Sequence, residues 1–132
     1  RGHSDDIEQA LRGTLNKFEH QSGLKAHLAL SGHGVALHSD VQLQVLHVVQ
    51  EALSNIRKHA QASEVWVQVV KGPPWTFSVR DNGRGFDAAS VNAAGTGFGL
   101  QIMRERAAGI GAEVRLESTP GQGTEVVLTL PQ

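Results

Sequence analysis

The sequence predicts an α/β fold, a two-layer sandwich in which a mixed sheet is covered on one face by helices. Segments with helical spacing of apolar residues alternate with short runs of alternating apolar and polar residues, and neighbouring strand runs are joined by tight turns. The length of 132 residues is sufficient for one domain and too short for two ordinary ones. We therefore treat residues 1–132 as a single domain. Residues 1–4 are a candidate cloning remnant, and we base no prediction on them.

The first half of the chain supplies two helices and a strand. Apolar residues recur at helical spacing over residues 5–18. Residues 24–30 alternate and predict a strand, which Gly32 and Gly34 interrupt. A long helix is predicted over residues 40–60, and Asp40 is a suitable cap for its first turn.

The second half supplies four strands, a loop and a helix. Strands are predicted over residues 64–70 and 75–79, joined by a Gly-Pro-Pro turn. Residues 82–99 are rich in Gly, Ala, Asn and Ser and predict a long mobile loop, and residues 98–108 form a helix that ends at Gly109 or Gly111. Strands near residues 114–116 and 126–130 flank a turn at 119–123. Adjacent strands joined by tight turns favour the mixed sheet.

Composition excludes several classes of function. A net charge of −1 argues against a nucleic-acid footprint or a membrane-surface patch, because both need clustered Lys and Arg. Without cysteine there is no disulfide framework or thiolate metal site, which fits a reducing compartment. No run approaches the roughly 20 apolar residues that cross a bilayer, and no signal peptide opens the chain. We expect a cytosolic domain or a soluble piece of a larger protein.

The helix predicted over residues 40–60 has two different faces. An apolar stripe should lie on the sheet, and the opposite face carries Glu51, Asn55, Lys58 and His59 at i, i+4, i+7 and i+8. For an arbitrary helix, such a stripe is more often a solvated surface than a site. Asparagine is a poor helix former, however, and its hard oxygen suits Mg²⁺, which takes few protein ligands beside phosphate oxygens. The stripe alone leaves both interpretations open.

Two glycine-rich segments follow. Gly83, Gly85 and Ala88 match a loose dinucleotide fingerprint, but a Rossmann unit needs the glycine turn to open a helix at once, and this one leads into a loop. No phosphate loop of the P-loop type is present. The segment from Gly95 to Leu100 directly precedes a helix, where free backbone N–H groups and the helix dipole favour phosphate. A glycine-rich hinge without a ligand explains that segment equally well.

Four motifs in order resemble the nucleotide-binding boxes of the histidine-kinase ATPase family, whose superfamily includes type II topoisomerases, MutL and the chaperone ATPases. They are Glu-Ala-Leu-Ser-Asn-Ile-Arg-Lys-His-Ala at residues 51–60, Asp-Asn-Gly-Arg-Gly-Phe at 81–86, Gly-Thr-Gly-Phe-Gly-Leu at 95–100 and Gly-Gln-Gly-Thr at 121–124. The first box, with the valine-rich strand after it, is similar to that of nitrate/nitrite sensor kinases, as is the short lid at about residues 84–97. The resemblance implies a Bergerat-type ATP-binding fold with ATP and Mg²⁺ as cofactors.

At the adenine end, the resemblance implies roles for four residues. Asp81 would accept a hydrogen bond from the exocyclic amino group of adenine, and Thr124 would complete that contact directly or through water. Gly83 and Gly85 would let the backbone pass close to the base and let the lid pivot.

At the phosphate end, Asn55 would coordinate Mg²⁺, and Lys58 and His59 would neutralise phosphate charge. Glu51 is the candidate base that orients or deprotonates an incoming imidazole. Backbone amides of the third box would hold the outer phosphates, through Gly95, Gly97, Gly99 and Leu100.

The function that the resemblance implies is the ATP-binding catalytic domain of a two-component sensor histidine kinase, which transfers the γ-phosphoryl group to a histidine on a dimerisation domain. None of the seven histidines here lies in the expected acceptor motif, so we do not expect this chain to autophosphorylate alone. Expected partners are that dimerisation domain and, indirectly, a response regulator, with no nucleic acid and no direct membrane contact. We expect this to be the cytoplasmic part of an inner-membrane-anchored kinase. The alternatives are an anti-sigma-factor-like serine kinase and a non-enzymatic module switched by nucleotide.

Overall fold

The structure, a computed structural model, describes residues 3–85 and 99–132. Its elements follow the predicted order. They are α1 (His3–Ser22), β1 (Lys25–Gly32), α2 (Ser39–Asn55), the π-helical turn η1 (Ile56–Ala60), β2 (Glu64–Lys71), β3 (Thr76–Asp81), α4 (Leu100–Ala108), β4 (Glu113–Ser118) and β5 (Thr124–Thr129).

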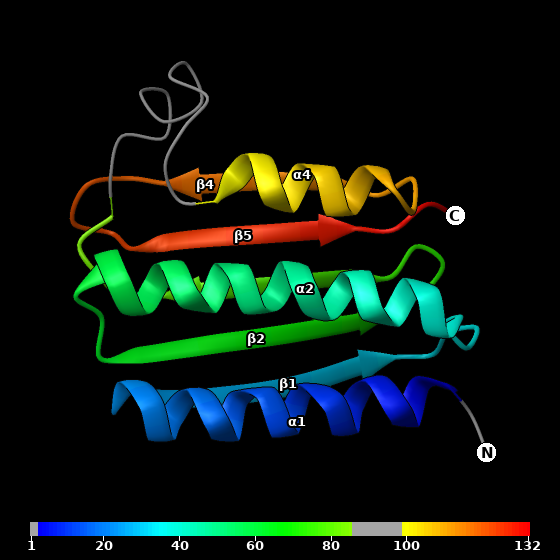
Figure 1. Cartoon of the computed structure of the whole chain (residues 1–132), viewed down its shortest axis with the longest axis horizontal. Helices are drawn as coiled ribbons and strands as arrows, with labels where there is room; N and C mark the ends of the chain where they lie inside the picture. The colour runs from blue at the N-terminus through cyan, green and yellow to red at the C-terminus, as the bar shows by residue number, and fades with distance from the viewer. Residues whose placement is uncertain (1–2, 86–98) are drawn as a thin grey trace.

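The strands form one mixed sheet in the order β1-β2-β3-β5-β4. β1 and β2 are parallel, and the remaining neighbours are antiparallel. Helices α1, α2 and α4 all lie on one face of this sheet (Figure 1). The predicted two-layer α/β sandwich is therefore confirmed.

The core lies between the helices and the sheet, because alternate strand residues point toward the helices. In β2 these are the valines that the sequence places at every second position, and β3 continues the same face with Phe77 and Val79. From α2, η1 and α4 the core receives Val45, Val48, Val49, Ala52, Leu53, Ile56, Met103 and Ala107. Among the described residues, no helix is long and apolar enough to cross a membrane.

The long helix departs from its prediction in two ways. Its α-helical part ends at Asn55, the chain continues as the π-helical turn η1, and Gln61 ends that turn in the left-handed conformation with φ 54°. The polar stripe is also only partly exposed, because α4 packs along α2 and leaves Glu51 and Asn55 half-buried, whereas Lys58 and His59 are exposed. The exposed side of α2 is instead marked by Leu43 and Gln50.

Candidate functional site

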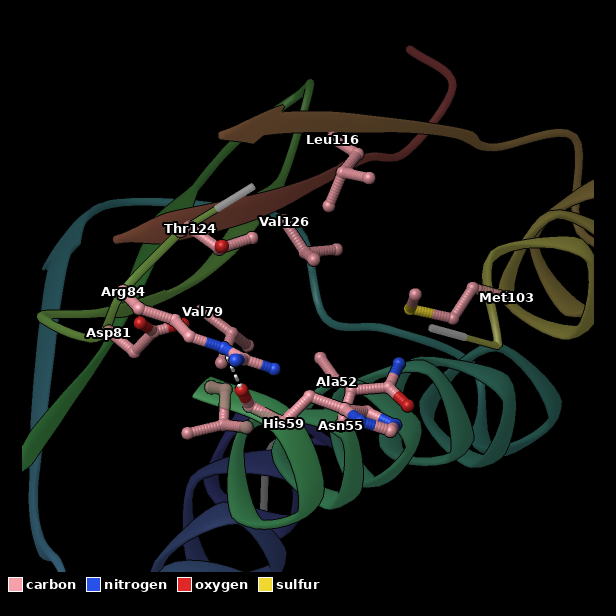
Figure 2. Close-up of a pocket in the computed structure, with 12 residues that line it drawn as sticks. Ala52, Asn55, His59, Val79, Asp81, Arg84, Met103, Leu116, Thr124 and Val126 are labelled. Atoms are coloured by element: carbon pink, nitrogen blue, oxygen red, sulfur yellow. Dashed lines mark hydrogen bonds between the residues drawn. The ribbon is translucent and has the colours of Figure 1, made fainter. Parts of the chain in front are cut away.

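A cavity of about 380 Å³ lies between the end of α2, α4 and the strands β3, β5 and β4 (Figure 2). Most of its wall is apolar, with a few polar groups among the apolar side chains, which is the usual make-up of a small-molecule site. It is lined by Ala52, Asn55, Ile56, His59, Val79, Asp81, Arg84, Gly85, Met103, Leu116, Thr124 and Val126.

Asp81 is the most deeply buried polar residue of this cavity, with 1% of its surface exposed. It is the last residue of β3 and lies on the same strand face as Phe77 and Val79. Its Oδ1 accepts the N–H of Gly83 at 2.7 Å. Its Oδ2 is also buried but accepts no hydrogen bond from the described part of the chain. Such an acceptor in an apolar cavity is suited to a donor on a ligand.

The electrostatics of Asp81 follow from this placement. Burial raises the pKa of its carboxyl group, since the charged form loses its hydration. The backbone amides of Gly83 and Thr124 and the positive charge of Arg80 oppose this and favour the carboxylate. The guanidinium of Arg80 is itself held over the ring of Trp66, 4.2 Å from its centroid, and Trp66 lies on the neighbouring strand β2.

Thr124 lies beside Asp81 because of strand register. It begins β5 and is paired directly with Asp81 across the antiparallel β3–β5 ladder. Its Oγ1 lies 2.8 Å from Oγ of Ser118, which also contacts the carbonyl oxygen of Gly123 at 3.0 Å. A carboxylate and an oriented hydroxyl therefore lie together where β3 and β5 line the cavity.

The segment that follows β3 is fixed up to Gly85, although the sequence predicted a mobile loop from residue 82. The Oδ1 of Asn82 accepts the backbone N–H groups of Ser63 and Glu64 at 2.9 and 3.0 Å. The Nε of Arg84 donates to the carbonyl oxygen of His59 at 2.8 Å. Gly85 passes so close to the backbone of residue 119 that an added Cβ would overlap it, and its φ is +64°. Residues 82–85 form no helix or strand, as expected of a loop, but the contacts of Asn82, Arg84 and Gly85 hold them against the rest of the domain. Residues 86–98 of the predicted loop lie outside the described residues.

The helix side of the site comes from α2 and η1. Asn55, the last residue of α2, and His59 of η1 both line the cavity, whereas Lys58 is exposed and does not line it. The side chain of Glu51 lies against Gly99, and a Cβ on that glycine would overlap the Glu51 carboxylate. The Glu51 carboxylate is therefore next to the N-terminal end of α4.

The structure brings together five of the residues singled out from the sequence, Asn55, His59, Asp81, Gly85 and Thr124, as lining of one cavity. Gly83 lies directly behind them through its bond to Asp81. Leu100 is 3% exposed and belongs to the core. Gly95 and Gly97, like most of the lid proposed at residues 84–97, lie outside the described residues.

Sequence reasoning missed the apolar lining and Arg84. Val79, Leu116 and Val126 lie on the inward faces of their strands, so their alternation with exposed residues would have identified them. Met103 carries no such signal beyond helical spacing. The contact of Arg84 with the end of η1 joins residues 25 positions apart, which no local pattern reports.

Comparison with known proteins agrees with this geometry. Residues 40–132 match the family model described as histidine kinase-, DNA gyrase B-, and HSP90-like ATPase. Among curated proteins, the signal transduction histidine-protein kinase/phosphatase DegS of Brevibacillus brevis is 36% identical over 78 residues. The nitrate/nitrite sensor protein NarQ of Escherichia coli is 37% identical over 82 residues. The matches cover 58% and 61% of this chain but only 20% of DegS and 14% of NarQ.

Solved structures show the same fold. The catalytic domain of histidine kinase ThkA aligns with a TM-score of 0.77 at 12% identity, over 98% of this chain and 92% of that one. The histidine kinase domain of a blue-light activated kinase from Erythrobacter litoralis aligns with a TM-score of 0.74 at 23% identity, over 95% and 60% of the two chains. The family match, the two curated kinases and this shared fold confirm the resemblance carried by the four boxes. The chain belongs to the family of histidine kinase-, DNA gyrase B- and HSP90-like ATPases.

Proposed function

We propose that the cavity binds the adenine of Mg-ATP, and that this chain transfers the γ-phosphoryl group to a histidine on a separate dimerisation domain. The observation that carries the proposal is Oδ2 of Asp81, a buried acceptor that receives no hydrogen bond from the described residues. The exocyclic amino group of adenine is a donor of the right kind. Guanine presents a carbonyl oxygen at that position, which would meet the carboxylate with like partial charge, so ATP should be preferred over GTP.

The shape and chemistry of the wall support adenine as the bound group. Ile56, Val79, Met103 and Val126 offer apolar surface to the two faces of a flat ring. The hydroxyl of Thr124 is in place to complete the polar contact at the edge of the base. A buried carboxylate on an otherwise apolar wall restricts the site to ligands that supply a donor there.

The phosphates would then extend toward α2 and the start of α4. Asn55 would place its side-chain oxygen on Mg²⁺, and His59 and the flexible Lys58 would offset phosphate charge. Mg²⁺ bound there would neutralise charge on the phosphate oxygens during transfer. The described residues contain no group of three or more His, Cys, Asp and Glu side chains that could hold a metal, so we assign the other Mg²⁺ ligands to phosphate and water.

Glu51 is the candidate that would orient or deprotonate the acceptor imidazole. Its carboxylate lies next to the N-terminal end of α4, where the outer phosphates would be held by backbone amides that include Gly99. Residues 1–132 would form this one catalytic domain, with residues 84–97 as its lid. The acceptor domain and, indirectly, a response regulator would be its partners in the cytoplasm.

The proposal is tested by calorimetric titration of Mg-ATP and Mg-GTP into this chain. Saturable binding of ATP without binding of GTP is expected. When the chain is joined to the dimerisation helices of its own kinase, label from γ-³²P-ATP should appear on protein in an acid-labile, base-stable form. Acid-stable label would instead indicate a serine or threonine acceptor and contradict the histidine kinase assignment.

Asn55→Ala is expected to weaken ATP binding about tenfold in the presence of Mg²⁺ and to leave it almost unchanged in excess EDTA. The reason is that a metal ligand contributes only when the metal is bound. Calorimetry under both conditions measures the difference. Equal weakening with and without Mg²⁺ would show that Asn55 shapes the cavity and does not hold the metal.

A further inference from the structure

Arg84 bridges the two sides of the cavity. It follows β3 by three residues, and its side chain reaches across to η1, where Nε donates to the carbonyl oxygen of His59 at 2.8 Å (Figure 2). The two ends of this contact belong to opposite walls, and both residues line the cavity. This hydrogen bond therefore links the two walls at this point, beside the contact of Asn82 with Ser63 and Glu64.

The acceptor of this hydrogen bond lies at the end of a helix. The last carbonyl groups of a helix have no partner within it, and a cation near them is favoured by the helix dipole. η1 ends at Ala60 and the next residue, Gln61, turns into the left-handed conformation. Arg84 supplies a charged donor at this position from a different part of the chain, in place of the local glycine cap that many helices use.

The base of Arg84 is itself fixed. Its carbonyl oxygen accepts the N–H of Gly121 in the turn before β5, and its neighbours Gly83 and Gly85 contact Asp81 and residue 119. The hydrogen bond to His59 consequently ties η1 to backbone that is itself bonded to the turn before β5. η1 carries His59 and directly follows Asn55, so its position also sets where those two side chains meet the cavity.

We infer that Arg84 is a positioning residue for nucleotide binding, which holds η1 at the spacing that the base requires. The inference rests on the proposed function. It differs from a direct contact with phosphate, because Arg84 acts through the backbone of His59. Loss of the hydrogen bond between Arg84 and His59 should weaken the binding of every adenine nucleotide by the same factor, whatever the number of phosphates.

The test compares Arg84→Met and Arg84→Lys with the unchanged protein. Arg84→Met keeps the apolar stem and removes the donor. We expect it to lower the affinities for adenosine, ADP and Mg-ATP alike by about tenfold, as for loss of one charge-assisted hydrogen bond. Arg84→Lys keeps a cationic donor and should restore most of the affinity. With the dimerisation helices attached, Arg84→Met should raise KM for ATP and leave kcat nearly unchanged.

Amide hydrogen exchange without nucleotide tests the inference separately from the proposed function. Exchange over residues 56–61 should become about tenfold faster in Arg84→Met and recover in Arg84→Lys. Arg115→Met is the matched control, since Arg115 is an exposed arginine in β4 that does not line the cavity. Unchanged amide exchange over residues 56–61 in Arg84→Met would overturn the inference. A loss of affinity that grows from adenosine to ATP would overturn it as well. Absence of ATP binding by the unchanged protein would overturn the proposed function instead, while the exchange result would still stand.

Discussion

Asp81→Asn is expected to abolish ATP binding and, at the same time, to make the nucleotide-free protein more stable at neutral pH. If the amide NH2 introduced by this substitution takes the position of Oδ2, it faces the amino group of adenine as a second donor. If it takes the position of Oδ1, the hydrogen bond from Gly83 is lost. In either case the affinity for ATP should fall at least about 100-fold. The gain in stability has another cause. The carboxylate is buried, one of its oxygens accepts no hydrogen bond from residues 3–85 and 99–132, and the amide carries no charge to desolvate.

The raised pKa of Asp81 determines how the stability difference between Asp81→Asn and the unchanged protein changes with pH. An acid whose pKa is higher in the folded state than in the unfolded state opposes folding as it ionises. This penalty is absent below the unfolded value near 3.8 and is fully present above the folded pKa. The free energy of unfolding of Asp81→Asn should therefore exceed that of the unchanged protein by about 1 kcal/mol at pH 7. This difference should disappear as the pH falls from the folded pKa of Asp81 to its unfolded value.

Urea unfolding at several pH values, followed by circular dichroism, measures this difference, and calorimetry with Mg-ATP measures the loss of binding. A variant that unfolds more easily at pH 7 would show that Asp81 stabilises the empty cavity. Retained ATP affinity would remove Asp81 from the adenine contact altogether. The two results are independent, because the first is obtained without nucleotide.

Gly123→Ala is expected to lower the free energy of unfolding by about 3–4 kcal/mol and to weaken ATP binding at least tenfold. Gly123 has φ +84°, and a Cβ there would overlap the backbone carbonyl of Asp81. Backbone atoms cannot rotate away as the end of a side chain can. Relief would require the ends of β3 and β5 to separate, which would displace Asp81 and Thr124 together.

The matched control is Gly121→Ala, two residues earlier in the same turn. Gly121 has φ +81°, but a Cβ there would meet no atom within 4 Å. This variant isolates the cost of the left-handed backbone, about 1 kcal/mol, and should bind ATP normally. Thermal unfolding and calorimetry of both variants separate the two contributions. Equal effects would mean that close approach of the strands at Gly123 is unimportant.

The sequence was sufficient for the class of fold and the order of its elements, because alternation and helical spacing are local patterns. Helical spacing also predicted that Asn55 and His59 share one side of their helix, and both line the cavity. The pairing of Asp81 with Thr124 did not follow from periodicity. The predicted strands ended at residue 79 and began at residue 126, and only the family resemblance connected the two residues.

The remaining features of the site depend on contacts between distant segments. Helical periodicity assumes a constant turn, so it could not show that the helix widens into η1 after Asn55. The exposed position of Lys58 and the half-buried position of Glu51 follow from that turn and from the packing of α4 on α2. The contact of Arg84 could not be predicted without knowing where η1, which carries His59, ends in space.

The place of β5 in the sheet has a consequence for synthesis of the protein. β5 is the last of the five strands along the chain, yet it lies between β3 and β4 in the sheet and not at an edge. Until residues 124–129 have left the exit tunnel, β3 and β4 lack the strand that joins them, and the wall that carries Thr124 does not exist. A nascent chain should therefore acquire nucleotide affinity abruptly, when residues 124–129 have left the exit tunnel, and not gradually as it lengthens.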